Sequence, residues 1–388
     1  MFFLPFAALL KVAPGTISFY TLALLVVYGV CVVLKSRQVP IVHLIPALLL
    51  IAQTLIVKVS YGYSFSNSYI LFCATLLLIP FIKQALDGAY DYYWLTLCFT
   101  LGVVLAAITS QYLTAYPSIA QYIETIDMVS YTRHSGYYGD PNFYSAIITT
   151  AMSGVLVLLS NQGKKSRVIA LVLTVLLLVY CGLLSVSKTF LLVAVCLFLF
   201  WGADLMFQKG KLSAKLTMII ITIIAICFLL SSTVFTDLIS VALSRFSRDA
   251  NLSDFTTGRT DLWLNYLRAL GSDPKLLLFG SGYTKVEVGG RASHNTIIQM
   301  VYQFGLVGSV FLVSWIVCFV RTLLADMRRS RVRLAQVAIL LLGAFGPWIA
   351  LDYLFFDEFF LFIVYVCIAL RYLVDQSVAT ESLMEGNE

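Results

Sequence analysis

Apolar residues run along this chain in long stretches separated by short polar or charged connections. Most stretches last roughly 17 to 20 residues, the length that an α-helix needs to cross the hydrocarbon core of a bilayer. The pattern predicts an all-α polytopic integral membrane protein with about 11 to 12 transmembrane helices. The expected spans are residues 16–34, 41–57, 68–82, 92–109, 143–159, 168–184, 190–207, 216–232, 296–320, 334–350 and 358–373. A tilted or re-entrant path of the first dozen residues would supply the twelfth.

Composition agrees with a single transmembrane domain over residues 1–388. Hydrophobic residues make up 60% of the sequence and charged residues 12%, and the mean hydropathy is +0.91. All eight cysteines fall inside the apolar stretches, so the sequence offers no extramembrane disulfide framework and no cysteine-based metal spacing. The start, MFFLPFAALLK, lacks a basic n-region and a small-residue cleavage site, so we expect it to belong to the mature protein rather than to a signal peptide.

Alternate connections differ sharply in basic charge. One set holds 15 of the 26 Lys and Arg residues. They are Lys35, Arg37, Lys83, Lys164, Lys165, Arg167, Lys209, Lys211, Lys215, Arg321, Arg328, Arg329, Arg331, Arg333 and Arg371. Cytoplasmic connections of membrane proteins carry this excess, so we expect the set in the cytoplasm. The net charge of +6 then reflects topology and does not indicate a nucleic-acid partner.

Two sizeable loops are expected on the outer side, residues 110–142 and the large loop of residues 233–295. The segments FTDLISVALSRFSRD and TTGRTDLWLNYLRALG within the large loop have apolar residues at helical spacing, which predicts short amphipathic helices against the membrane surface. The following FGSGY is a glycine-rich turn. No strand precedes it and no P-loop lysine follows, so it does not indicate a nucleotide site.

The segment TRHSGYYGDPNF ends the first outer loop. Asp140 and Pro141 suit the N-cap and the first helical position of the next span. Arg133 and His134 are candidates for binding an anionic substrate, because a cation on the outer side opposes the orientation bias and nearby glycines allow close backbone approach. A solvated loop arginine is the alternative for Arg133.

Two further cations suit a phosphate ligand. Lys188, in LLSVSKTFLL, is expected in a turn of about five residues at headgroup depth, where it either contacts a lipid-linked phosphate or snorkels without a ligand. Arg259 begins the second loop helix, where its guanidinium and backbone N–H groups would hold an anion together. A salt bridge with Asp254 or Asp261 is the alternative.

The segment ASHNTIIQMVYQFGLVG begins a span on the outer side. Ser293 or Asn295 is expected to cap this helix, and Gly305 and Gly308 are expected to allow close helix packing. His294 lies at the boundary of the span. With only three histidines in the chain, it is a candidate base for an outer-face reaction.

The run of Arg133 with GYYGDPN, then SVSKT, GRTDLW, LFGSGY and ASHNTIIQMVYQFGLVG resembles the bacterial O-antigen polymerase and ligase superfamily, which comprises Wzy-like polymerases and WaaL-like ligases. The similarity covers residues 130–310 at the level of motifs and the other spans by hydropathy. It implies a polytopic glycosyltransferase of the bacterial inner membrane with its active site facing the periplasm. Donor and acceptor would be undecaprenyl-diphosphate-linked glycans, with no metal and no cofactor.

The same resemblance matches Arg259 to the loop arginine, His294 to the histidine before the late span, and Lys188 to the basic residue between two middle spans. These three are the expected catalytic residues, although ligase-like members usually carry arginine at the position of Lys188. The expected substrate-binding residues are Arg133, His134, Asn295, Arg245 and Arg291. Membrane lipid, a flippase and a chain-length regulator are the expected partners.

Three functions remain open from the sequence. A polymerase would join lipid-linked repeat units, and the lysine in SVSKT favours this function. A ligase would transfer the finished glycan to another acceptor such as lipid A core. A transporter or flippase would favour broken helices and ionisable residues at mid-membrane, whereas the candidate residues of this chain gather in outer loops.

The charge asymmetry generates a topology prediction. In a cysteine-free background, Ser272→Cys should react with a membrane-impermeant maleimide in intact cells, because residues 233–295 are expected to face the periplasm. Ser330→Cys, in the basic connection of residues 321–333, should react only after the cells are permeabilised. Labelling of the second position and protection of the first would reverse the predicted orientation.

Overall fold

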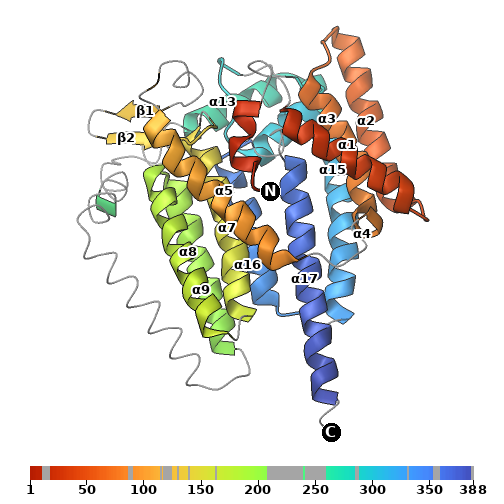
Figure 1. Cartoon of the computed structure of the whole chain (residues 1–388). Coiled ribbons are helices and arrows are strands. Elements are labelled where there is room, and N and C mark those ends of the chain that lie inside the picture. Colours follow the sequence, from red (N-terminus) through yellow and green to blue (C-terminus); the bar gives the residue numbers. More distant parts are fainter. Residues whose placement is uncertain are drawn as a thin grey trace. The chain divides into compact units, whose positions relative to one another are not determined.

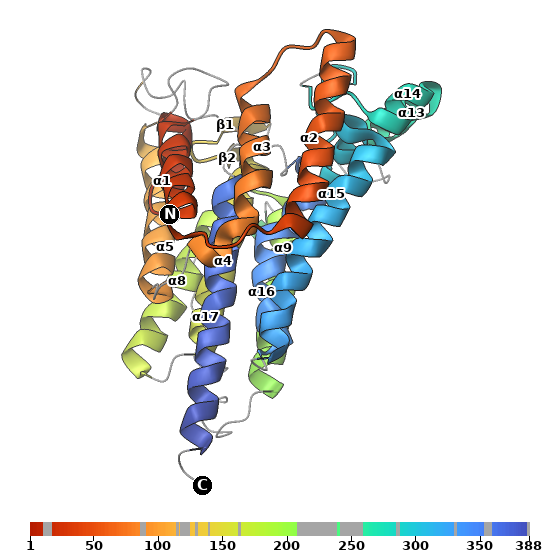
Figure 2. The ribbon, with the colours of Figure 1, turned by 90° about the vertical axis from the view of Figure 1, so that its right-hand side faces the viewer.

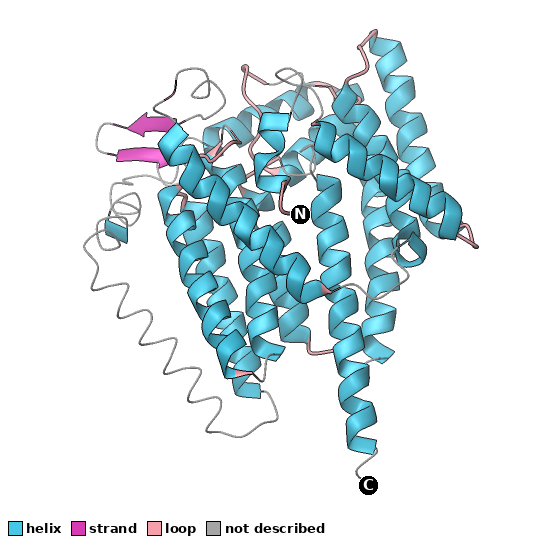
Figure 3. Ribbon diagram, viewed as in Figure 1, coloured by secondary structure: helices cyan, strands magenta, loops and turns pink. Residues whose placement is uncertain are grey.

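The computed structural model describes residues 1–10, 18–85, 91–113, 116, 125–128, 131–138, 140–161, 164–207, 239–240, 259–284, 288–329, 332–352 and 359–385. It is almost entirely helical (Figure 3). In this described part, eight helices are long and apolar enough to cross a membrane, and Phe19–Lys35 and Leu334–Ile349 are shorter apolar helices. The protein is therefore a polytopic membrane protein, as the pattern predicted. The expected span of residues 216–232 lies outside the described residues.

The chain divides into two compact units. Unit 1 comprises Met1–Leu9, Asp91–Asp249 and Val332–Pro347, and unit 2 comprises Leu10–Tyr90, Ala250–Arg331 and Trp348–Glu388. The described elements of unit 1 are η1 (Leu4–Leu10), α5 (Tyr92–Leu113), β1 (Thr125–Met128), β2 (Tyr131–His134), α7 (Pro141–Asn161), α8 (Lys165–Leu184), α9 (Lys188–Phe207) and α16 (Leu334–Phe345). The short helix η3 (Gly346–Ile349) begins in unit 1 and ends in unit 2. Colours in Figure 1 follow the chain through these elements.

Unit 1 is built around α7. Its neighbours α5, α8, α9 and α16 pack against it, and nearly every residue of the helix is buried. Small side chains make this possible: a Cβ on Gly343 of α16 would lie 2.4 Å from the Cβ of Ser153. Thr149 Oγ1 donates a hydrogen bond to the Gly343 carbonyl at 2.9 Å. Such small-residue contacts allow apolar helices to approach closely without a polar mismatch.

A polar cluster joins three helix ends of unit 1. Arg333, which precedes α16, donates to Asp204 of α9 at 3.1 Å and to Asn161 at the end of α7 at 2.7 Å. Gln336 Nε2 lies 3.3 Å from the same Asp204 oxygen. Asp204 is buried, so its charge needs this pairing.

The first dozen residues do not supply a described span. Residues 4–10 form the short 3₁₀ helix η1, which rises only about 14 Å at 2 Å per residue. The chain before it lies against α5, where a Cβ on Gly102 would collide with the carbonyl of Phe2. The hydroxyl of Tyr138 donates to the carbonyl of Leu4. The segment is thus packed on unit 1 as a short turn.

The first predicted outer loop contains a two-stranded sheet that the all-helical pattern did not predict. Strands β1 and β2 pair antiparallel, with Ile126 opposite Arg133 and Met128 opposite Tyr131. Two residues separate the strands in the sequence, which is the usual length of a tight hairpin connection. The local run of β-branched and aromatic residues suits strands, but four residues are too few for a reliable periodic signal.

Unit 2 holds the remaining described elements. They are α1 (Phe19–Lys35), α2 (Ile41–Tyr61), α3 (Asn67–Leu78), η2 (Ile79–Phe81), α4 (Ile82–Ala85), α13 (Arg259–Ser272), α14 (Pro274–Phe279), α15 (Thr296–Arg329) and α17 (Phe359–Glu385). Caps set several of these boundaries: Ser18 and Ser66 accept backbone N–H bonds at the starts of α1 and α3, each worth about 1 kcal/mol. Pro80 separates α3 from α4.

Helices α2 and α15 form the main contact within unit 2 and run side by side in Figure 2. Gly308 allows their close approach, as predicted, because a Cβ there would lie 2.6 Å from Gln53 Oε1 of α2. Gly305 also allows close packing, in its case against the backbone of α14, and it has a second role that was not predicted. Its φ of +64° breaks the helical geometry of α15, in the region that only glycine adopts without strain.

The glycine-rich segment that follows α14 packs against the break in α15 and donates hydrogen bonds to it. The backbone N–H groups of Ser281 and Gly282 donate to the carbonyls of Tyr302 and Gln303 at 3.0 and 2.9 Å. A Cβ on Gly305 would lie 2.4 Å from the carbonyl oxygen of Leu278. The FGSGY segment is therefore a docking element for the kink in α15.

Replacing Gly305 tests this arrangement. Gly305→Ala should lower the free energy of unfolding by about 1–3 kcal/mol, because the methyl group collides with backbone and the positive φ becomes strained. Gly202→Ala in α9 is the matched control, since a Cβ added there would meet nothing within 4 Å; it should be neutral or slightly stabilising. Thermal unfolding of the detergent-solubilised proteins measures both, and equal midpoints for the two variants would contradict the proposed contact.

Candidate functional site

A tight turn before α15 carries His294. The φ of His294 is +50°, in the left-handed region where histidine occurs more often than most non-glycine residues. Asn295 caps the helix, since its Oδ1 accepts hydrogen bonds from the backbone N–H groups of Ile297 and Ile298 at 3.0 and 3.1 Å. This confirms the predicted cap and assigns it to Asn295 rather than Ser293. The imidazole of His294 is half-buried at the N-terminal end of a membrane-spanning helix.

Asp352 anchors this turn from a segment far along the chain. Its Oδ1 accepts hydrogen bonds from Ser293 Oγ at 2.8 Å and from the Asn295 backbone N–H at 3.0 Å. Its Oδ2 accepts from the His294 backbone N–H at 3.2 Å. The carboxylate therefore holds three consecutive residues and stabilises the strained backbone at His294.

Burial and the neighbouring polar groups shift the pKa of Asp352 in opposite directions. Burial raises the pKa of the carboxyl above its ordinary range, because desolvation penalises the charged form. The hydrogen bond from Ser293, the charge of His294 and the backbone N–H bonds lower the pKa, and burial outweighs them. The Asp352 carboxyl, a titratable group, thus accepts a hydrogen bond from the backbone of His294, the candidate base.

One face of α13 lies against the same turn. Trp263 Nε1 donates to the carbonyl of Ser293 at 3.0 Å, and the Tyr266 hydroxyl donates to the carbonyl of Arg291 at 2.8 Å. Tyr266 also packs edge to face on Tyr302 of α15, with ring centroids 4.9 Å apart. These contacts confirm a short helix at this position with a buried apolar face.

Arg259 is the first residue of α13, as expected from the sequence. It precedes Trp263 by four residues and Tyr266 by seven, so the three share one helical face. The face that touches the His294 turn therefore begins with a guanidinium. Arg291 stands on a tight turn over Gly289 and Gly290, both with positive φ, and its side chain is exposed.

Unit 1 carries a second group of candidate residues around Arg133. The Arg133 side chain is only 7% exposed, so it is not a solvated loop arginine. Its Nε donates to the carbonyl of Ser185 at 3.1 Å, and its Nη2 lies 3.5 Å from Asn142 Oδ1. Ser187 Oγ donates to that Asn142 oxygen at 2.9 Å. Arg133 thus joins strand β2 to the start of α7 and to the α8–α9 turn.

Lys188 directly follows this polar cluster. The sequence predicts it inside a turn of about five residues, but α8 ends at Leu184 and α9 begins at Lys188, so the turn is shorter and the lysine is helical. Ser187 caps α9 through a bond from the Phe190 backbone N–H at 3.4 Å. The turn is tight because Ser185 and Ser187 satisfy its backbone locally. His134 lies beside Arg133 on β2 and pairs with Thr125.

The candidates therefore fall into two groups within the part of the chain described. Unit 2 contains Arg259, Arg291, His294 and Asn295, and unit 1 contains Arg133, His134 and Lys188. Arg245 and Asp254 lie outside the described residues. Over the described ranges, no group of three or more His, Cys, Asp or Glu side chains is placed to hold a metal ion.

No protein-family model matches this chain, and no curated protein matches it either. The chemistry of the two residue groups consequently carries the functional argument.

Sequence reasoning missed Asp352. The residue interrupts an apolar run in IALDYLFF, and an acid in that setting was a usable signal because burying a carboxylate is costly without partners. Trp263 was also missed, since its position is that of an ordinary interfacial aromatic. Both act through contacts with residues far away in the sequence.

Replacing Asp352 tests its hold on the His294 turn. In Asp352→Asn, the amide oxygen can still accept from Ser293 and Asn295, but an NH₂ group replaces the oxygen that accepts from His294. Because the folded pKa is raised, the stability contributed by Asp352 is present below the ordinary carboxyl pKa and is lost as the pH rises through the raised value. Thermal unfolding between pH 4 and pH 7 should show this decline in the wild type and a flatter profile in Asp352→Asn. Parallel profiles would contradict it.

Proposed function

We propose that this protein is a polysaccharide polymerase, a metal-independent glycosyltransferase that joins lipid-diphosphate-linked oligosaccharide repeat units. In this proposal it resides in the bacterial inner membrane with the His294 turn facing the periplasm. The donor and the acceptor are undecaprenyl-diphosphate-linked glycans, as the motif resemblance implies.

The observation that carries the proposal is the His294 turn of unit 2. An imidazole at the end of a membrane-spanning helix is fixed through its backbone by the carboxylate of Asp352. The face of α13 that begins with Arg259 contacts the same turn through Trp263. A candidate base, a candidate anion-binding guanidinium and an indole are thus held by one small set of contacts.

This combination suits glycosyl transfer from a diphosphate. The acceptor hydroxyl attacks the anomeric carbon, a new C–O bond forms, and the bond from that carbon to the diphosphate oxygen breaks. His294 takes the hydroxyl proton as general base. Arg259 and Arg291 stabilise the charge that develops on the leaving diphosphate, where a guanidinium fork is the best geometric match.

The cations of unit 1 suit the same class of ligand. Arg133 is buried and oriented by Ser185 and Asn142, and Lys188 begins the adjacent helix. Preorganised cations of this kind bind phosphate with little loss of side-chain freedom. We assign Arg133 and His134 to substrate binding in the proposed enzyme and retain Lys188 as one of its catalytic residues.

Two other functions make different demands. A ligase would use the same chemistry with another acceptor, such as lipid A core, and only the acceptor distinguishes it from the polymerase. A transporter would be supported by ionisable residues near the bilayer midplane. The candidate residues of the two units stand at helix ends, on strand β2 or on the turn before α15, which supports surface chemistry on a lipid-linked substrate.

Deletion of the gene, followed by gel analysis of surface glycan, tests the proposal. A polymerase predicts loss of the polymer ladder while a single repeat unit stays attached. Loss of all attached glycan would indicate the ligase, and an unchanged ladder would contradict both.

Complementation with His294 variants tests the base. His294→Asn removes the imidazole but retains a residue that tolerates the positive φ, which makes it a cleaner test than His294→Ala. It should lower the transfer rate by roughly 10²-fold or more, and His294→Arg should not restore it. His43→Asn is the matched control, because His43 lies on α2 and contacts Thr322 instead. Substantial activity in His294→Arg would reduce His294 to a phosphate contact.

A further inference from the structure

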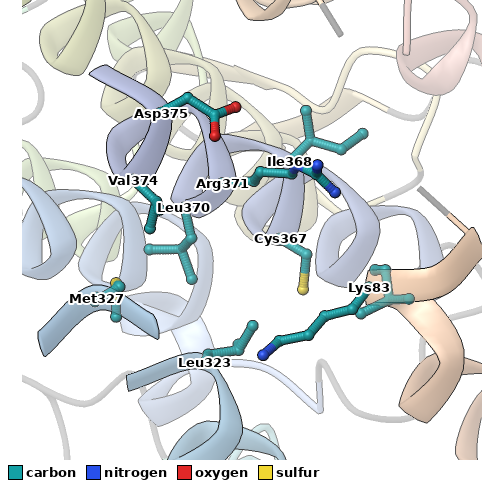
Figure 4. A pocket seen from close by; sticks show the side chains of 10 residues that line it. Lys83, Leu323, Met327, Cys367, Ile368, Leu370, Arg371, Val374 and Asp375 are labelled. Atoms are coloured by element: carbon teal, nitrogen blue, oxygen red, sulfur yellow. The ribbon is translucent and has the colours of Figure 1, made fainter. Parts of the chain in front are cut away.

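A cavity of about 300 Å³ lies in unit 2 between α4, α15 and α17. Figure 4 shows it with the side chains that line it. Its walls are mostly apolar, formed by residues such as Ile82, Leu323, Met327 and Ile368. Lys83, Arg371 and Asp375 supply the charged groups. The cavity therefore has a mostly apolar lining, and its three charged side chains give it a formal net charge of about +1 at neutral pH.

The cavity is remote from the His294 turn within the same unit. Leu323 follows Thr296, the first residue of α15, by 27 positions, or about 40 Å along a helix. That distance exceeds the thickness of a hydrocarbon core. The two regions thus occupy opposite ends of one membrane-spanning helix, and the cavity has no part in the proposed transfer reaction.

Lys83 connects the three walls. It comes from α4, and its Nζ lies 3.3 Å from the carbonyl of Thr322 on α15. In Figure 4 its side chain extends across the cavity towards Leu323, and Cys367 of α17 lies close by. The ammonium group is consequently positioned at the junction of α4, α15 and α17.

The other two charges come from α17. Arg371 and Asp375 are four residues apart, so they share one face of that helix. Arg371 is half-buried and Asp375 is exposed. A ligand phosphate contacting Lys83 and Arg371 would be bound by cations from two different helices.

An exposed apolar surface leads along α15 to the cavity. Val310, Val313, Val317 and Val320 are each at least 39% exposed and recur at spacings of three and four residues, which places them on one side of the helix. Leu323 and Met327 of the cavity follow Val320 by three and seven residues. An acyl chain lying along these valines would reach the cavity at its headgroup end.

From these observations we propose that the cavity is a binding site for an anionic phospholipid, whose headgroup phosphate contacts Lys83 and Arg371 while an acyl chain lies against α15. Basic pockets between membrane helices suit anionic headgroups. A zwitterionic lipid would gain less, since its own cation would meet two positive side chains. The bound lipid would hold α4, α15 and α17 together.

Native mass spectrometry and thermal unfolding of the full chain in detergent test the site. Phosphatidylglycerol should remain bound and should raise the unfolding temperature more than phosphatidylcholine or inorganic phosphate at equal concentration. Lys83→Gln and Arg371→Gln should each weaken phosphatidylglycerol binding about fivefold. Lys165→Gln, which removes an exposed cation at the start of α8, is the matched control and should leave binding unchanged.

A variant with stronger predicted binding distinguishes a direct effect on the site from loss of binding through misfolding. Asp375→Asn removes the acidic side chain that lines the cavity and should strengthen phosphatidylglycerol binding, which an unfolded variant cannot do. Equal stabilisation by inorganic phosphate would overturn the lipid assignment in favour of a free anion. Equal binding of phosphatidylcholine, or binding unaffected by all three cavity variants, would overturn the site.

Discussion

A helix in an apolar environment has to satisfy every backbone carbonyl, because no water is available to replace a lost hydrogen bond. Helix α15 breaks this rule at Gly305 and depends on other elements to restore it. The N–H groups of Ser281 and Gly282 bond the carbonyls of Tyr302 and Gln303, and the Gln53 side chain of α2 lies 3.3 Å from the carbonyl of Phe304. The organisation of unit 2 around its candidate site depends on these hydrogen bonds at the kink of α15.

These hydrogen bonds at the kink have a direct consequence for the His294 turn. Docking the segment after α14 onto the kink brings α13 and α14 against α15, and Tyr266 and Leu270 of α13 pack on Tyr302. The same face of α13 then meets the turn at Ser293. An irregular point inside the membrane helix thereby fixes the position of Arg259 at the helix end. Asp352 completes the arrangement by holding the backbone of His294.

The helices of unit 1 pack around a central helix that has no such kink among its described residues. This central helix, α7, carries Ser, Thr, Ala and Gly along much of its length, and the hydroxyl groups of Thr149, Thr150 and Ser153 donate to backbone carbonyls. Arg333 with Asn161 and Arg133 with Asn142 secure the helix at its two ends. The charged side chains of these contacts thus lie at helix ends and near the α8–α9 turn, where Lys188 begins α9.

The spans were predictable because each one satisfies its own backbone and needs only sufficient length and apolarity. Boundaries set by local caps were also within reach: Asp140 before α7 and Asn295 before α15 act on residues two or three positions away. Arg259 at the start of α13 followed from the same local reasoning. These features depend on neighbours in the sequence.

Tertiary structure alone decided the rest. The sequence could not show that Asp352 would accept hydrogen bonds from a turn 58 residues away, that Arg133 would be buried against Ser185, or that Gly305 would break its helix where it packs on α14. Each of these depends on which distant groups fill a volume and complete a hydrogen bond. Apolar periodicity specifies that a helix is buried but leaves open its partners, because many pairings bury similar areas. The choice among them comes from close packing and from the cost of every polar group left unsatisfied.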